Sequence, residues 1–352
     1  MSVPTPFRQW LIAAIVFIAS FDLAFVSQKL AGAYESEFGG HPDEAAHYVT
    51  GLFVREAMIT LPRVISERSL APLDVFKKDA PDGFYAHYPK VALGVWPPFF
   101  YVVQSAWTLP FGVSRSSVLL LMCALAAILA VLLYRPLAEE FGIVGGIVGV
   151  VFLFSLPLWR EYNAMIMAES LSAVTMFTAA LAWGRFLDTG KMRSAIWFGI
   201  LASVAILTKG TGLALAIAAP LALVLSGKWQ LLLRRATWVA AGIVALIAGP
   251  WTWYFRDEGR LKGGWLQPDP SWSFTREALS YYGAKLSIAV GMVLLVFVVA
   301  GLAAKLLRRG QWNGRWMSLI SLVIAVFILQ VALPVGLVVR GGEEGLLDWG
   351  LA

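Results

Sequence analysis

Residues 118–133 read VLLLMCALAAILAVLL, a run without one charged side chain. A second run, from Leu286 to Ala304, is similarly apolar. A helix of about 20 apolar residues crosses the hydrocarbon of a bilayer, and it satisfies its own backbone hydrogen bonds there. The whole chain is 59% hydrophobic and only 14% charged, whereas soluble domains are about a quarter charged. The sequence therefore predicts an all-α polytopic integral membrane protein.

Several more apolar runs extend this prediction to most of the chain. The first run is expected to stay as an uncleaved span rather than a removed signal peptide, because it is long and carries Asp22. Residues 97–111 are short and contain Pro110, so we expect them to dip into the membrane without crossing it. The predicted spans are residues 9–28, 116–134, 142–159, 164–186, 194–208, 211–226, 236–255, 285–307 and 316–339.

Two long polar stretches divide the predicted spans, and we expect one transmembrane domain over residues 1–352. Glu44 to Leu61 can form an amphipathic juxtamembrane helix with Val49, Leu52, Phe53 and Ala57 along one side. Such a helix would lie flat on the membrane surface. The expected parts are a first span (9–28), a large outer catalytic loop (29–96), a membrane bundle (97–256), a second outer loop (257–284) and the last spans and tail (285–352).

The formal net charge of +6 arises from short basic clusters between the apolar runs. Cytoplasmic loops of membrane proteins carry such clusters, so nucleic acid is not an expected partner. Counting spans from these loops places the 29–96 loop, Glu169, Lys209 and the 257–284 loop together at the outer face. The clusters are Arg185, Lys191 and Arg193; Lys228, Arg234 and Arg235; and Lys305, Arg308, Arg309 and Arg315.

The polar string HPDEAAHY, residues 41–48, holds two adjacent acids just after the first span. An ionised carboxylate there can take a proton from an acceptor hydroxyl or amine as a general base. Neighbouring helical positions point about 100° apart, so only one of the two is expected to face a substrate. We assign the chemistry to Asp43 and expect Glu44 to cap or orient the following helix. The alternative is a solvated helix N-terminus, where acids favour the helix dipole.

Glu169 stands at the start of another apolar run. Acids within membrane segments are costly and are usually functional. Glu169 is therefore the second catalytic candidate: beside Asp43 it could hold a divalent metal ion or steer the acceptor. The alternative is a helix-start acid just above the lipid.

Lys209 lies in LTKGTG, residues 207–212, a break between two apolar runs. A cation beside flexible glycines suits a lipid-linked phosphate, although a Lys that reaches for the headgroups is the alternative. Arg256, after an aromatic stretch, and Arg340 are further phosphate candidates, and each could equally be an interfacial or topological anchor.

The three histidines, His41, His47 and His87, all lie in the first outer loop. Their spacing matches no metal-binding signature, so no cofactor is firmly expected; a divalent metal ion is a possibility, with Asp43 and Glu169 as its candidate ligands. Aromatic faces stack on sugar rings, and they also pack loops onto lipid. The candidate substrate-lining residues are His87, Tyr88, Trp96 and Tyr162. The single cysteine, Cys123, is expected to be a small buried hydrophobe.

In this order, the motifs resemble those of the GT-C membrane glycosyltransferases, in particular the protein O-mannosyltransferase and lipid A aminoarabinose transferase group. The resemblance covers about residues 9–260. Its motifs are Pro42-Asp43-Glu44 leading through Val54-Arg55-Glu56-Ala57, then Trp96-Pro97-Pro98-Phe99-Phe100-Tyr101, Glu169, and Leu207-Thr208-Lys209-Gly210.

The resemblance implies a GT-C-like helix bundle and a sugar donor on polyprenyl phosphate. Asp43 would be the base in an inverting transfer to a lipid, glycan or protein acceptor. Lys209, and less directly Arg340, would offset charge on the departing phosphate. The implied location is the bacterial inner membrane, among membrane lipids, with the active site facing outward.

Three positions depart from the family pattern. Glu169 replaces the usual Asp, and Trp96 stands where a Lys or His commonly precedes the Pro pair. Residues 343–348 read EEGLLD, where the family often has Glu-Arg-Tyr-Leu, so we expect a C-terminally shortened member. Two other functions stay open: a non-catalytic membrane scaffold, and a transporter of a lipid-linked substrate, which Asp22 inside the first span would favour.

Overall fold

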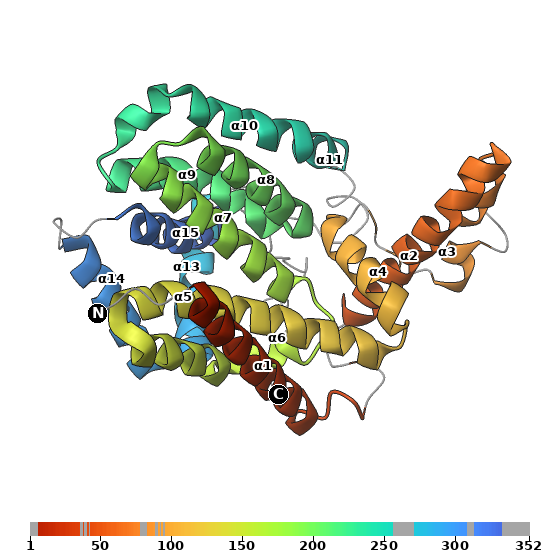
Figure 1. The fold of residues 1–352 in the computed structure, drawn as a ribbon, viewed down its shortest axis with the longest axis horizontal. Coiled ribbons are helices and arrows are strands. Elements are labelled where there is room, and N and C mark those ends of the chain that lie inside the picture. The colour runs from red at the N-terminus through yellow and green to blue at the C-terminus, as the bar shows by residue number, and fades with distance from the viewer. Residues whose placement is uncertain are drawn as a thin grey trace. The chain divides into compact units, whose positions relative to one another are not determined.

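The computed structural model describes residues 6–35, 38, 41, 43–77, 83–88, 91, 93, 96–255, 271–307 and 313–332. The regular elements among these residues are all helices, which confirms the predicted all-α class (Figure 1). The chain divides into two compact units. The first contains Met1–Leu93 and Pro98–Val174, and the second contains Gly94–Pro97 and Thr175–Ala352.

The first unit is built on the packing of α1 against α5 and of α2 against α4 (Figure 1). Between α1 and α5, small side chains such as Ala24, Ala126 and Ala130 let the backbones approach closely. Cys123 is buried in this cluster, as predicted. The elements are α1 (Pro6–Leu30), α2 (Asp43–Glu67), η1 (Ala71–Phe76), α3 (Phe84–His87), α4 (Phe99–Phe111), α5 (Arg115–Ser155), α6 (Pro157–Asn163) and the start of α7 (Glu169–Thr189).

Helix α5 is a hairpin of two helical segments, not one straight rod. Gly142 has φ 75° and ψ 178°, a conformation that only glycine adopts readily. The second segment folds back on the first. Gly146 packs so closely on Tyr134 that a Cβ there would stand 2.7 Å from the Tyr134 ring. A Cβ on Gly149 would collide with Leu137 in the same way. The hairpin accounts for two predicted spans, 116–134 and 142–159, although the second segment ends at Ser155.

The predicted span over 164–186 is wrong at its start, because the helix begins only at Glu169. Residues 165–168 form a non-helical segment between α6 and α7 whose residues are all buried. A buried irregular segment must find hydrogen bonds for its backbone. The Ile166 N–H finds one in the carboxylate of Glu44, 3.1 Å away. The hydrophobicity of this segment indicates burial, which the structure shows, but a buried segment need not be helical.

Helix α2 confirms the expected helix from Glu44 to Leu61, but a different face is buried. Val49, Leu52 and Ala57 are only partly buried, and of the predicted apolar side Phe53 alone is buried. The buried positions follow Glu44, His47 and Gly51 instead. Gly51 allows this contact, because any Cβ there would collide with the side chain of Gln104 on α4. The interior face of α2 is therefore largely polar.

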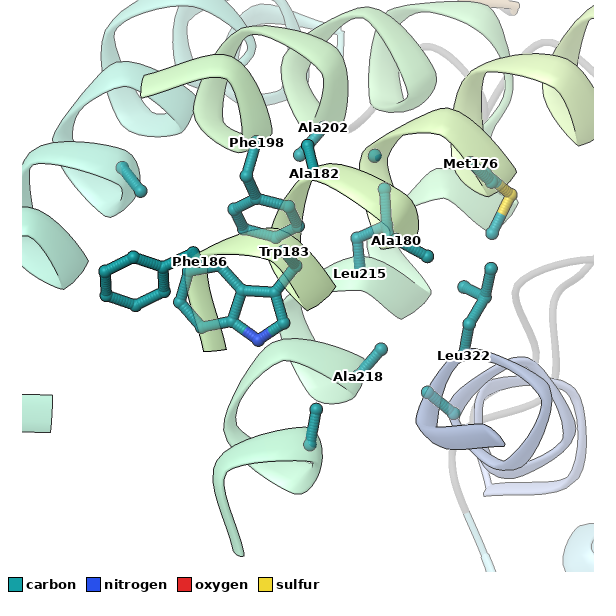
Figure 2. Close-up of a cluster of buried hydrophobic side chains, with 14 of the residues drawn as sticks. Met176, Ala180, Ala182, Trp183, Phe186, Phe198, Ala202, Leu215, Ala218 and Leu322 are labelled. Atoms are coloured by element: carbon teal, nitrogen blue, oxygen red, sulfur yellow. The ribbon is translucent and has the colours of Figure 1, made fainter. Parts of the chain in front are cut away.

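The second unit is a bundle of short helices around an apolar core (Figure 2). Trp183 lies next to Phe186 and Phe198, with ring centroids 4.8 Å and 4.5 Å apart, and its indole N–H donates to the Ala219 carbonyl at 3.0 Å. The elements are the rest of α7, α8 (Met192–Thr208), η2 (Gly210–Leu213), α9 (Ala214–Leu225), η3 (Trp229–Leu233), α10 (Arg235–Ile247), α11 (Gly249–Tyr254), α13 (Trp272–Val290), α14 (Met292–Leu307) and α15 (Gly314–Ala332).

In the described part of the chain, three helices are long and apolar enough to cross a membrane, by length and composition. They are Trp10–Leu30, Arg115–Ser155 and Gly314–Ala332, and shorter apolar helices cover Met192–Thr208, Gly210–Leu225 and Arg235–Ile247. Together they support an integral membrane protein. The predicted span 285–307 is broken, because Gly291 has φ 83° and separates α13 from α14. The end of the predicted span 316–339 lies outside the described residues.

Helix α4 has 13 residues, which corresponds to about 20 Å of helix. The hydrocarbon layer is about 30 Å thick, so α4 is too short to cross it. The dip of residues 97–111 into the membrane stays a prediction, because α10, which lies in a predicted span, also has 13 residues.

Candidate active site

The two acids of the 41–48 string point in different directions from the first turn of α2. The Asp43 side chain is 44% exposed, whereas the Glu44 side chain is completely buried. This separation is what neighbouring positions on a helix produce. Asp43 is therefore the solvent-accessible acid of the pair, and Glu44 faces the protein.

Glu44 accepts three hydrogen bonds through one carboxylate oxygen. Arg115 donates to Oε1 from Nε at 3.1 Å and from Nη2 at 2.7 Å, and the Ile166 N–H donates at 3.1 Å. Arg115, at the start of α5, also donates to the Ala33 carbonyl and lies 5.7 Å from the Phe38 ring. A buried carboxylate needs this kind of pairing to stay charged. The network fixes the N-terminus of α2, and with it the backbone of Asp43.

Sequence reasoning missed Arg115 as a site residue. Its sequence position, directly before a long apolar run, is also that of an ordinary interfacial anchor. The available signal was indirect: a second acid that turns away from substrate into the protein requires a cationic partner. Only the fold identifies Arg115 as that partner.

A buried tyrosine lies within electrostatic reach of both predicted catalytic acids. Tyr101, on α4, is 1% exposed, and its hydroxyl lies 2.8 Å from Nδ1 of His47. Burial raises the pKa of Tyr101 well above its usual 10, and the negative charges of Asp43 and Glu169 raise it further. Both carboxylates thus lie within electrostatic reach of one neutral phenol. The structure brings Asp43 and Glu169 to the same region of the first unit.

His41 lies beside Asp43, and Tyr162 lies near His41. The Asp43 N–H donates to Nδ1 of His41 at 3.2 Å, and the same nitrogen lies 3.9 Å from the Asp43 carboxylate. The His41 ring is 6.5 Å from the ring of Tyr162, which ends the last turn of α6. Tyr162, a predicted substrate-lining residue, is therefore near the exposed acid.

His87 and Tyr88 belong to a different aromatic layer, which packs on Phe53 of α2. The Phe84 ring lies 5.2 Å from the Phe53 ring and 4.8 Å from the Tyr88 ring. Both His87 and Tyr88 are exposed. The contacts of this layer are with the middle of α2 rather than with its acidic first turn.

The predicted phosphate-binding residues fall in the second unit or outside the described residues. Lys209 ends α8 in an extended conformation, which confirms the predicted break before η2. Gly212 has a packing role, because a Cβ there would stand 2.5 Å from the Ala205 backbone. Trp96, in the second unit, is partly exposed. Arg256 and Arg340 lie outside the described residues.

The expected divalent metal has few candidate ligands. Among the residues that the structure describes, no group of three or more His, Cys, Asp or Glu side chains could hold an ion. The carboxylate of Glu44 is already bonded to Arg115. Asp43 and Glu169 remain the candidate oxygen ligands, a pair that would hold Mg²⁺ or Mn²⁺ only with waters or substrate oxygens completing its shell.

One comparison with known proteins gives a match. Residues 95–254 match the family model described as dolichyl-phosphate-mannose-protein mannosyltransferase, which covers slightly less than half of the chain. No curated protein and no solved structure matches the chain. The family match confirms the resemblance to GT-C membrane glycosyltransferases, enzymes that take sugars from polyprenyl-phosphate donors. The matched residues include Tyr101, Tyr162, Glu169 and Lys209, but not the acidic string at 41–48.

Proposed function

We propose that this membrane glycosyltransferase uses Asp43 as the general base on its acceptor. One observation carries the proposal: Asp43 is the exposed member of an acid pair whose buried member fixes the turn. Glu169 adds a second carboxylate within electrostatic reach of Tyr101. A positioned base next to water and membrane is what an acceptor hydroxyl or amine requires.

In the proposed step, the Asp43 carboxylate takes the proton from the acceptor O–H or N–H. The acceptor atom forms a bond to the anomeric carbon from the face opposite the phosphate. The bond between that carbon and the phosphate oxygen breaks, and polyprenyl phosphate leaves with the electron pair. The anomeric configuration is therefore inverted, and no further reactant is needed.

Other residues have supporting parts in this proposal. Glu169 orients the acceptor, and Tyr162 lines the site beside Asp43. Lys209, with Arg256 and Arg340, offsets the charge on the leaving phosphate. His87, Tyr88 and Trp96 offer aromatic faces to a sugar or its acceptor. We propose an outward-facing site in a bacterial inner membrane, with a hexosyl or pentosyl donor and a lipid, glycan or protein acceptor.

Asp43→Asn tests the general base. The assay is release of free polyprenyl phosphate from a labelled lipid-linked sugar, with purified protein and an acceptor. We expect the rate to fall about 10²- to 10⁴-fold, the range that general-base catalysis contributes. The matched control is Glu56→Gln, which removes a charge from an exposed position on the same helix.

The control should keep the wild-type rate within about twofold. An unchanged rate in Asp43→Asn would reject Asp43 as the base. Movement of the labelled lipid across the membrane without release of the phosphate would instead support a transporter.

A further inference from the structure

A cavity in the second unit lies far along the chain from the acidic string and has no part in the proposed reaction. Its volume is about 340 Å³, and it opens where the turn between α7 and α8 meets the connection from α9 to α10. The lining residues are Leu187, Asp188, Thr189, Gly190, Gly227, Lys228, Gln230, Leu231 and Arg234. The two connections carry basic clusters that we predict to be cytoplasmic.

One wall of the cavity is a fixed ion pair. Lys228 donates from Nζ to the Leu187 carbonyl at 2.9 Å and to Oδ1 of Asp188 at 3.2 Å. The same Asp188 oxygen accepts from the Gly314 N–H at 2.7 Å, which ties in the start of α15. Lys228 and Asp188 balance each other in charge. Their ion pair fixes this wall of the cavity, and the net charge of the cavity comes from another residue.

Arg234 supplies that charge. Its side chain is exposed, and in the described part of the chain it makes no hydrogen bond or ion pair. Its Nη1 atom lies directly over Gly190, 2.8 Å from where a Cβ would stand. Gly190 has φ 62°, so glycine is favoured there for its backbone as well. The guanidinium is therefore presented to the cavity with its donors available.

Exposed apolar side chains neighbour the lining residues in the sequence. Trp229 is 59% exposed and Leu233 is 82% exposed, both on the short helix η3, and Trp238 on α10 is 68% exposed. The indole N–H of Trp238 donates to the Leu232 carbonyl at 3.0 Å, which holds the ring on this loop. Tryptophan at such positions marks the level of the lipid headgroups. The connection from α9 to α10 and the start of α10 thus carry both a cationic donor and exposed apolar side chains.

We propose that this cavity binds the phosphodiester headgroup of an anionic phospholipid, with Arg234 as its main ligand. Guanidinium donors match phosphate oxygens in pairs, and basic pockets between membrane helices on the cytoplasmic side hold such headgroups. Trp229 and Leu233 lie where the acyl chains begin. Lys191, Arg193 and Arg235 lie within three residues of lining residues in the sequence, and their positive charge favours a lipid with a net negative charge.

Native mass spectrometry of the purified full chain tests this site, with phosphatidylglycerol and phosphatidylcholine as probes. Wild type should retain phosphatidylglycerol at least tenfold more tightly than phosphatidylcholine. Arg234→Gln should weaken phosphatidylglycerol binding about tenfold or more. The matched control is Arg235→Gln, which removes the neighbouring charge from a residue outside the cavity lining and should weaken binding less than about fivefold, the effect of one surface charge.

Two further arms make the result decisive. Arg234→Lys keeps the charge but loses the paired donors, so it should bind with intermediate affinity even if Arg234→Gln folds poorly. Glycerol 3-phosphate should bind much more weakly than the lipid. Equal losses in Arg234→Gln and Arg235→Gln would overturn the proposal, and so would equal affinity for both lipids. Binding of glycerol 3-phosphate as tightly as phosphatidylglycerol would show a free-phosphate site instead.

Discussion

Two adjacent acids on α2 have opposite environments, and this difference organises the candidate site. Glu44 is an internal anchor with three hydrogen bonds, and Asp43 remains accessible. The sequence predicted that the two side chains would face different surroundings, and their exposures agree, because helical geometry points neighbouring side chains apart. It could not find Arg115 or Ile166, since both contacts join residues far apart in the sequence. A sequence pattern shows that an acid is present but not which cation faces it.

The Arg115–Glu44 pair predicts a large loss of stability when its cation is removed. Arg115→Gln removes the two guanidinium donors that pair with the buried Glu44 carboxylate, which should cost about 3–5 kcal/mol in the free energy of unfolding. Thermal unfolding in detergent measures the change. The control is Arg63→Gln, which breaks the exposed pair of Arg63 and Glu67 and should change stability by less than about 1 kcal/mol. Equal effects of the two substitutions would contradict a buried anchor at Arg115.

Tyr101 predicts a specific alkaline sensitivity. Its pKa is raised in the folded protein, so above about pH 10 the unfolded chain loses a proton that the folded chain keeps. The contribution of the protonated Tyr101 to the free energy of unfolding is fully present below pH 10. It is lost as pH rises above 10, by up to about 1.4 kcal/mol per pH unit. Tyr101→Phe should therefore show a shallower decline in unfolding temperature between pH 9.5 and about 11 than wild type. Parallel declines would mean that Tyr101 ionises normally.

At the scale of elements, the sequence predicted helices well and their ends less well. Apolar runs are a local signal, so α1, α8 and the two segments of α5 fall close to the expected spans. The prediction missed the start of α7, because residues 165–168 are as apolar as a helix would be although they are not helical. It also missed the break at Gly291, because one glycine hardly lowers the hydrophobicity of an apolar run. The buried face of α2 was also missed, since polar residues line it.

Gly142 should be difficult to replace, because its backbone conformation turns the α5 hairpin. Its backbone conformation is strained for any residue with a Cβ, so Gly142→Ala should destabilise the protein by about 1–3 kcal/mol. Gly242→Ala is the control, because Gly242 lies within α10 and a Cβ there meets no atom within 4 Å. It should be neutral or stabilising by up to about 1 kcal/mol. Thermal unfolding of both variants compares them, and a neutral Gly142→Ala would argue against the hairpin.

For the whole molecule, composition and charge predicted the membrane class, and the family match supports the glycosyltransferase class. The placement of functional residues into two units could not be predicted, because no local pattern marks that division. The roles of the predicted phosphate-binding residues stay predictions. Lys209 lies in the second unit, and Arg256 and Arg340 lie outside the described residues.

The expected topology can be tested with single cysteines. Cys123 is completely buried, so it should give little background with a membrane-impermeant maleimide. In intact cells, Glu56→Cys on α2 should be labelled, and Arg193→Cys in the first turn of α8 should be labelled only after the membrane is opened. The reason is that basic loops stay on the cytoplasmic side. Labelling of Arg193→Cys in intact cells would reverse the predicted orientation.

The bond between Glu44 and the Ile166 N–H joins residues 122 positions apart, and this has a consequence for biosynthesis. The ribosome must add all of those residues before the anchor can close. At about 5–20 residues per second, the acidic turn waits roughly 6–24 s for its last partner. A nascent chain stalled before residue 166 should therefore leave this turn sensitive to protease, and one stalled well beyond the first unit should protect it.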